Sequence, residues 1–289
     1  MDDILFSMRR SSVLVGSLLT LLFLAAALIW SAAFVGNRSL LSVSFLDVGQ
    51  GDAIFIDAPR GPQALIDGGA GTALLRELAR EMPWWDRSLD IIIATHPDMD
   101  HIGGLIELLP RYRVGTIVVS SVEGDTDAWD TFIDLAKKEG ARIVEAMRGQ
   151  SIELGDARIT ILFPDRPVPR IETNTGSIVA RLEYGETAFV LSGDSPSGVE
   201  EYLASLDAAG LRANVLKAGH HGSKTSSSPI FIGYVQPEYA VFSRGCDNRY
   251  GHPDEEVKDL YARFGIPTLD TCTGGTVTFV SDGQTVTPQ

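Results

Sequence analysis

The sequence predicts an α/β fold in which two mixed β-sheets stack between outer helices, an αββα sandwich. Short apolar runs bounded by turn residues alternate with amphipathic segments over about residues 42–281, which indicates strands and helices in alternation. The middle of the chain places several strand-like runs in succession, as antiparallel neighbours do. Strand-rich halves flanked by helices are typical of two sheets packed face to face. No internal repeat or linker interrupts residues 39–289, so we expect one domain there.

The pattern of apolar residues and the positions of turn residues predict the individual elements. Strands are expected where apolar and β-branched residues run together: Ser42–Val48, Ala53–Asp57, Gln63–Asp67, Asp90–Ala94, Gly115–Ser120, Ala157–Phe163, Ser177–Tyr184, Thr187–Ser192, Ala213–Lys217, Tyr239–Ser243 and Gly275–Val280. Helices are expected where apolar residues recur every three or four positions: Ala73–Glu81, Ile102–Leu109, Ser197–Ser205 and Asp254–Phe264. Glycine-rich turns, such as Gly49-Gln50-Gly51, separate neighbouring strands.

An apolar segment precedes the domain. The chain has no charged residue from Ser11 to Asn37, and about residues 13–35 are almost wholly apolar. A bilayer-spanning helix needs about 20 apolar residues, whereas the core of a signal peptide needs only about 7–15. We therefore predict that residues 1–38 form a membrane anchor with one transmembrane helix.

The charges beside this segment predict its orientation. Arg9 and Arg10 precede it and Arg38 follows it, and arginines are enriched on the cytoplasmic side of membrane helices. This small excess predicts a single-pass protein of the cell membrane, with its large domain outside the cytoplasm.

Composition limits the classes of partner. The net charge is −14, and it is −15 for the residues after Arg38, because the first 38 residues contain three of the 24 basic and two of the 38 acidic residues. Such a domain repels long polyanions unless metal ions or a local basic patch attract them. The two cysteines, Cys246 and Cys272, are too few for a disulfide scaffold and lack the spacing of a zinc site, so either one disulfide or two free thiols is open. No protein partner can be inferred.

A loop directly after the strand at Asp90–Ala94 contains four side chains that can bind metal ions. These are His96, Asp98, Asp100 and His101. Imidazole nitrogens and carboxylate oxygens suit Zn, Mn or Fe. In an extended loop His96 and Asp98 face one side, while Asp100 and His101 begin a helix and face another. The spacing therefore suits two neighbouring ions, whereas a merely exposed acidic loop would leave both histidines without a packing role.

Three further segments after strand ends carry polar chemistry. Asp194 follows a strand and Gly193, a weak signal alone but a natural bridging ligand beside two metals. His220 and His221 form a pair flanked by small residues, in a segment that would otherwise read as a flexible loop. The remaining candidates would bind or protonate a phosphate group: Ser223, Lys224, Asn248 and His252.

Taken together, these segments resemble the metallo-β-lactamase fold and, within it, the hydrolase domain of the competence protein ComEC family. The resemblance spans nearly all of residues 42–281 and rests on six motifs in order: Phe45–Asp52, Asp67–Gly69, His96–His101, Leu191–Asp194, Gly219–Ser223 and Asn248–Pro253. Full-length ComEC proteins also contain a channel of many membrane helices, which one helix cannot make. The resemblance therefore implies hydrolysis rather than transport.

The resemblance also implies a ligand set. One metal would bind His96, Asp98 and Asp194, and the other would bind Asp100, His101, Asp194 and one histidine of the pair, for which we expect His220 over His221. Two departures from the broader fold concern the first metal: Asp98 stands where most members have histidine, and Asn174 occupies the region of a missing histidine. Harder ligands favour Mn²⁺ or Mg²⁺, with Zn²⁺ still possible.

These observations predict a membrane-anchored metal-dependent hydrolase, a phosphodiesterase or nuclease that cleaves DNA with water activated by two divalent ions. The candidate catalytic residues are Asp100, Ser223, Lys224, Asn248 and His252. Two alternatives stay open: a phosphodiesterase for small or wall-linked phosphodiesters such as phosphorylcholine esters, and an anchored binding protein without catalysis. Hydrolysis of β-lactams is not expected, because Asp98 and the missing histidine disturb the three-histidine zinc site.

Overall fold

The computed structural model describes residues 16–29 and 40–289. The chain divides into two units, Met1–Ser39 and Leu40–Gln289. In the first unit, residues 16–29 form a helix with exposed side chains. Across the two described ranges, none of the helices combines the length and apolar character that crossing a bilayer requires. The predicted transmembrane segment, about residues 13–35, extends beyond the described residues at both ends, so the anchor stays a prediction.

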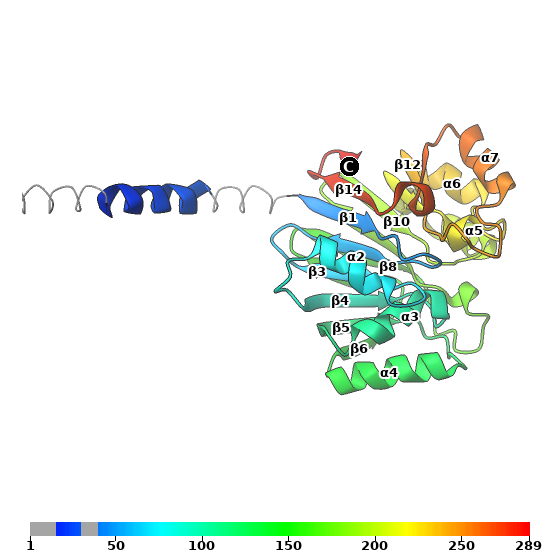
Figure 1. Ribbon diagram of the computed structural model, residues 1–289. Coiled ribbons are helices and arrows are strands. Elements are labelled where there is room, and N and C mark those ends of the chain that lie inside the picture. The colour runs from blue at the N-terminus through cyan, green and yellow to red at the C-terminus, as the bar shows by residue number, and fades with distance from the viewer. Residues whose placement is uncertain (1–15, 30–39) are drawn as a thin grey trace, which may run out of the picture. The chain divides into compact units, whose positions relative to one another are not determined.

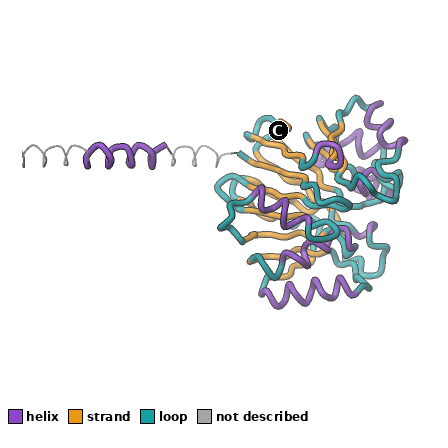
Figure 2. The backbone as a smooth tube through the Cα atoms, viewed as in Figure 1, coloured by secondary structure: helices purple, strands orange, loops and turns teal. Residues whose placement is uncertain are grey.

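Two stacked β-sheets with helices on their outer faces form the second unit, as predicted (Figures 1 and 2). The first sheet has the strand order β15-β14-β1-β2-β3-β4-β5-β6. Its strands are β1 (Leu41–Phe45), β2 (Ile54–Asp57), β3 (Gln63–Ile66), β4 (Ser88–Ala94), β5 (Arg113–Val119), β6 (Arg142–Glu145), β14 (Val277–Ser281) and β15 (Val286–Pro288). Strands β3 to β6 are parallel and the remaining pairs are antiparallel, so the sheet is mixed.

The second sheet has the order β13-β12-β11-β10-β9-β8-β7. Its strands are β7 (Ser151–Leu154), β8 (Ala157–Phe163), β9 (Val179–Tyr184), β10 (Thr187–Leu191), β11 (Val215–Lys217), β12 (Tyr239–Phe242) and β13 (Thr268–Asp270). Strands β10 to β13 are parallel, whereas β7 to β10 form an antiparallel meander. This sheet is therefore mixed as well.

Helices cover both outer faces. The first sheet packs against α2 (Ala73–Glu81), α3 (Met99–Leu108) and α4 (Asp127–Glu139), and the second against α5 (Ser197–Asp207), α6 (Pro229–Val235) and α7 (Glu255–Arg263). Short helical turns complete the described elements: η2 (Asn174–Gly176), η3 (Ala209–Leu211), η4 (Gly219–Gly222) and α8 (Thr271–Gly274).

Apolar side chains fill three layers. Between the sheets, the rings of Phe45 and Phe189 each contact Phe279 edge to face, at centroid distances of 6.1 and 6.2 Å. Successive residues of a strand point to opposite faces, so in β4 Ile93 enters this central layer while Ile92 packs under the helices. The continuous apolar run of β4 is thus explained by burial on both faces.

Three details differ from expectation or settle an open choice. The first strand ends at Phe45 rather than Val48, because Leu46 N–H donates to Ala53 and the chain turns into a loop. The sequence pattern did not reveal α4, β6 and β7 between residues 121 and 156, nor α6, β13 and β15 nearer the C-terminus. Cys246 and Cys272 form a disulfide, so the alternative of two free thiols is wrong.

Glycines in α3 and in the loop after β3 allow the backbones of these two segments to contact each other. Gly68 N–H donates to His101 O at 2.7 Å, and Gly104 N–H donates to Gly69 O at 2.9 Å. A Cβ atom added at Gly104 would lie 1.9 Å from Gly68 O. The first turn of α3, which bears Asp100 and His101, is therefore positioned by the absence of side chains at these positions.

We expect Gly104→Ala to destabilise the fold by about 1–3 kcal/mol, because the clash with Gly68 outweighs the gain in helix propensity. Chemical denaturation would measure the loss in free energy of unfolding. Gly71→Ala is the matched control, since a Cβ atom at Gly71 meets no atom of the described residues within 4 Å. Equal stabilities of the two variants would contradict the proposed backbone contact.

Candidate metal centre

The polar residues of the candidate site lie in loops that follow the carboxyl ends of strands in both sheets. Asp67 follows β3, His96 follows β4, and Asp194 follows β10. His220 and His221 follow β11 within η4. Because the two groups of parallel strands end at the same edge of the sandwich, side chains far apart in sequence meet there.

Each of four histidines is held by an oxygen on its Nδ1 atom. Nδ1 of His101 donates to Asp67 Oδ2 at 2.7 Å, and Nδ1 of His221 donates to the Ser243 carbonyl at 2.9 Å. The other contacts join His96 Nδ1 to Thr95 Oγ1 (2.9 Å) and Ser177 Oγ (3.1 Å), and His220 Nδ1 to Thr225 Oγ1 (3.0 Å). Metal-binding histidines typically have such an oxygen partner on the nitrogen that does not bind the ion.

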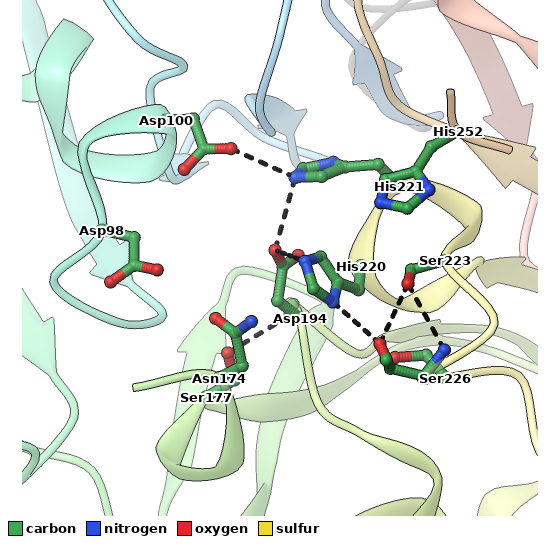
Figure 3. A network of polar contacts seen from close by, with 12 residues as sticks. Asp98, Asp100, Asn174, Ser177, Asp194, His220, His221, Ser223, Ser226 and His252 are labelled. Carbon is green, nitrogen blue, oxygen red and sulfur yellow. Dashed lines mark hydrogen bonds and ion pairs between the residues drawn. The ribbon is translucent and has the colours of Figure 1, made fainter. Parts of the chain in front are cut away.

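The opposite ring nitrogens approach Asp194, as Figure 3 shows for His220 and His221. Nε2 of His101 and of His221 each lie 3.3 Å from Asp194 Oδ2, and Nε2 of His220 lies 3.8 Å from it. Within the described chain, the buried Nε2 atoms of His96, His101 and His221 have no hydrogen-bond partner. Unpartnered buried nitrogens are costly, so their convergence makes them candidate metal ligands.

Carboxylates complete two groups around Asp194. Asp100 Oδ2 lies 3.4 Å from His221 Nε2, and Asp98 Oδ2 lies 3.7 Å from His96 Nε2. One set of ligand atoms, all within 4.8 Å of one another, comprises His96, His101 and Asp194, and another comprises Asp100, His101 and His221. This nitrogen and oxygen donor set fits two divalent cations that share Asp194.

Of the histidine pair, His221 lies deeper in the centre. Its side chain is buried, and it contacts Asp100 and Asp194, whereas His220 is partly exposed and contacts Asp194 at the longer distance. The geometry therefore groups His221 with Asp100, although the sequence favoured His220.

Backbone strain accompanies these positions. Asp67, His220 and His221 adopt left-handed φ angles of 59°, 48° and 56°, which are rare for residues other than glycine. Such conformations cost about 1–3 kcal/mol each and persist only where surrounding contacts enforce them. Here the strain turns both histidine rings toward Asp194.

A buried lysine balances the carboxylates. Lys217 is fully buried, and its Nζ donates to Gly193 O at 2.7 Å, forms a short ion pair with Asp52 and lies 3.3 Å from Asp194 Oδ1. Burial lowers the pKa of Lys217, but the charges of Asp52 and Asp194 outweigh this effect and raise the pKa. Burial raises the pKa of Asp52, but Lys217 and His221 together lower it to about 2. These groups are thus held as ions by each other.

The pKa values of His101 and His96 shift in opposite directions. Burial lowers the pKa of His101, but Asp194 and Asp67 outweigh burial and hold the pKa well above its usual range. Burial lowers the pKa of His96 well below that range. The carboxylates around these rings therefore favour positive charge in the centre, and divalent cations supply more of it than protons do.

The family model of the metallo-beta-lactamase superfamily matches residues 46–245, more than half of the chain. The chain belongs to the metallo-β-lactamase superfamily. It is therefore a metal-dependent hydrolase by family, and the superfamily binds divalent metals, typically two.

Curated relatives of this superfamily member include competence proteins. The chain is 33% identical to "ComE operon protein 3" of Bacillus subtilis over 255 residues, covering 82% of this chain and 32% of that protein. It is 34% identical to "Competence protein ComA" of Neisseria gonorrhoeae over 194 residues, covering 67% of this chain and 25% of that protein. The chain thus spans a third or less of the length of these relatives. The predicted resemblance to the competence proteins is confirmed.

Solved structures of the same fold are more distant. The diiron β-hydroxylase CmlA of Streptomyces venezuelae superposes with a TM-score of 0.54 at 14% identity, covering 80% of this chain and 52% of that chain. The metallo-β-lactamase fold protein YhfI of Bacillus subtilis gives the same TM-score at 15% identity, covering 82% and 99%. These matches show the fold alone.

The remaining predicted residues lie around the centre in different situations. Asn248 is engaged within its own loop, since its amide donates to Gly245 O and His252 O and accepts from His252 N–H. Ser223 is buried and contacts the Thr225 hydroxyl at 3.0 Å. Lys224 is exposed. His252 lies beside His220, with ring centroids 5.7 Å apart. Asn248 therefore shapes the loop rather than presenting a free amide to a phosphate.

Three residues beside the ligands were not assigned roles from the sequence. Asp52 and Asp67 occurred only as parts of motifs, yet Asp67 orients His101 and Asp52 contacts Lys217. Lys217 appeared only as the last residue of a predicted strand. A signal was present in each case, because a charged residue at the end of a buried strand requires a partner of opposite charge.

Lys217→Met should destabilise the metal-free protein by about 3–5 kcal/mol, because it leaves Asp52 and Asp194 buried without their cation. Excess Mn²⁺ should recover part of this loss, since bound cations offset the same carboxylates. Thermal unfolding in chelator and in Mn²⁺ would measure both effects. Lys138→Met, at an exposed position of α4, serves as the control. A loss that is identical with and without Mn²⁺ would contradict the assigned role.

Proposed function

We propose that this chain is a membrane-anchored phosphodiesterase that cleaves DNA with two divalent metal ions. The observation that carries the proposal is the convergence of buried, unpartnered histidine nitrogens and carboxylates on Asp194. The names of the relatives, which include competence proteins and "Recombination protein 2" of Haemophilus influenzae (28% identical, covering 83% of this chain and 29% of that protein), support DNA as the substrate.

Two ligand groups follow from the geometry. His96, Asp98 and Asp194 would hold one ion, and Asp100, His101, His221 and Asp194 the other. When bound, such ions polarise a phosphoryl oxygen and lower the pKa of water toward neutrality. Mn²⁺ suits the carboxylate-rich set, and Zn²⁺ and Mg²⁺ are the other candidates to be compared.

The chain's own residues would orient the substrate and stabilise the charge that develops on it. Burial lowers the pKa of His252, so its ring is mostly neutral near pH 7 and would donate a hydrogen bond, rather than a proton, to the departing oxygen. The exposed Lys224, which follows the histidine pair in the chain, would attract the phosphate of the substrate. Asp67 and the Ser243 carbonyl fix two of the ligand rings, which keeps the centre in one geometry.

A small phosphodiester is the second candidate substrate. The domain after Arg38 carries a net charge of −15, which opposes a long polyanion and does not penalise a small diester as strongly. Comparing turnover of an oligonucleotide with that of a phosphorylcholine ester decides between the two.

The anchor is part of the proposal. The uncharged segment from Ser11 to Asn37 supports insertion into a bilayer, with the hydrolase domain outside the cytoplasm. Carbonate extraction of membranes from expressing cells should leave the full chain in the membrane pellet, and protease added outside should digest the domain. Release of the chain by carbonate would overturn the anchor without touching the hydrolase.

The purified full chain should hydrolyse a single-stranded oligonucleotide with Mn²⁺ or Zn²⁺, and a chelator should abolish the activity. Asp67→Asn should lower metal affinity or activity by about 10–100-fold, because Asp67 fixes the His101 ring. Asp134→Asn, at an exposed position of α4, is the matched control. Hydrolysis that survives chelation, or that is unchanged in His101→Ala, would refute the two-metal mechanism.

A further inference from the structure

A cleft of about 380 Å³ opens beside the metal centre. Asp100, a proposed ligand, forms part of its wall, and so do Met99, Arg249 and Tyr250. The cleft is large enough for a small-molecule group, and Asp100 belongs both to its wall and to the metal centre, where a scissile phosphate would bind. A group of the substrate that fills this cleft would therefore lie close to that phosphate.

Polar and apolar side chains both line the cleft, and the three that offer a flat or flexible surface, Met99, Arg249 and Tyr250, are exposed. Tyr250 is 56% exposed and Met99 is 52% exposed. The Arg249 guanidinium lies over the Tyr250 ring, 5.2 Å from its centroid, and the Tyr250 ring lies nearly parallel to that of His252, at an angle of 12° and a centroid distance of 5.8 Å. Aromatic rings and guanidinium planes are the surfaces on which unpaired bases stack.

We infer that this cleft binds one unpaired nucleobase of the DNA, next to the phosphate that is cleaved. This inference rests on the proposed function and names its substrate more narrowly. Arg249 and Tyr250 supply the stacking surface, the flexible Met99 side chain fits against the base, and Asp247 and Gln50 at the margin of the cleft offer groups for its polar edge.

Charge favours this assignment. A domain with a net charge of −15 gains little from phosphate contacts, so affinity for DNA must come from the metal ions and from interactions that do not depend on charge. Base stacking is such an interaction, and one stacked base raises affinity by roughly tenfold or more.

The cleft also selects the form of DNA. In a duplex, each base face is covered by its neighbours and each polar edge is paired. A base can reach the wall formed by Arg249 and Tyr250 only from a single strand or a frayed end. The inferred substrate is therefore single-stranded DNA rather than an intact duplex.

Two matched oligonucleotides test the inference, one with bases and one with abasic sugars, because they carry the same phosphates. The full chain should cleave the base-bearing oligonucleotide with a kcat/KM about tenfold higher or more. Tyr250→Ala should largely remove this preference, whereas Tyr234→Ala, which changes an exposed tyrosine of α6, should retain it. Equal cleavage of both oligonucleotides by the wild-type chain would overturn the base cleft and leave the phosphodiesterase intact.

A second measurement does not depend on hydrolysis. Adenosine carries a base and no phosphate, so saturation-transfer NMR can report its contact with the chain in the presence of a chelator. Its base protons should receive saturation from the wild-type chain and from Tyr234→Ala, and much less from Tyr250→Ala. Transfer that is absent from the wild-type chain, or equal in all three proteins, would overturn the inference. Failure of the proposed function appears separately, as loss of metal-dependent cleavage of both oligonucleotides.

Discussion

The concentration of carboxylates in a buried space is the constraint on which the rest of the centre depends. Asp52, Asp67 and Asp194 are almost fully buried, and a buried negative charge is stable only beside a positive one. Lys217 supplies one permanent positive charge, and His101 supplies another when protonated. Divalent cations would satisfy the same requirement with more charge, so the charges that must be balanced for the fold to be stable also suit metal binding.

Such a centre needs loops held at fixed distances, and the architecture provides this through backbone contact. The bare backbone at Gly68 and Gly104 lets α3 approach the loop after β3, which places His101 against Asp67. On the other sheet, left-handed backbone at His220 and His221 turns the rings toward Asp194. Both sheets therefore contribute strained or closely packed segments, and the ligand geometry follows from these segments rather than from the side chains alone.

The ligand cluster could be predicted from the sequence because histidines and aspartates stand directly after apolar strands, where loops of an α/β fold converge. The choice between His220 and His221 could not, because two backbone dihedral angles decide which ring faces Asp100. Lys217 was overlooked because a strand ending in lysine reads as an ordinary strand. Helix α4 was missed although Thr126 caps its beginning and left-handed Gly140 follows its end, signals that periodicity alone does not use.

Electrostatics connects the metal centre to the kind of substrate that the domain accepts. A net charge of −15 makes approach of a polyanion unfavourable until cations occupy the centre, so metal binding and substrate binding favour each other. Beyond the first phosphate that attraction weakens with distance from the ions, and the net negative charge of the domain opposes further phosphates. A stacking surface beside Asp100 supplies affinity that salt and charge affect little. An acidic nuclease of this design would therefore engage few nucleotides at once, and its specificity would depend on exposed bases more than on the phosphate backbone.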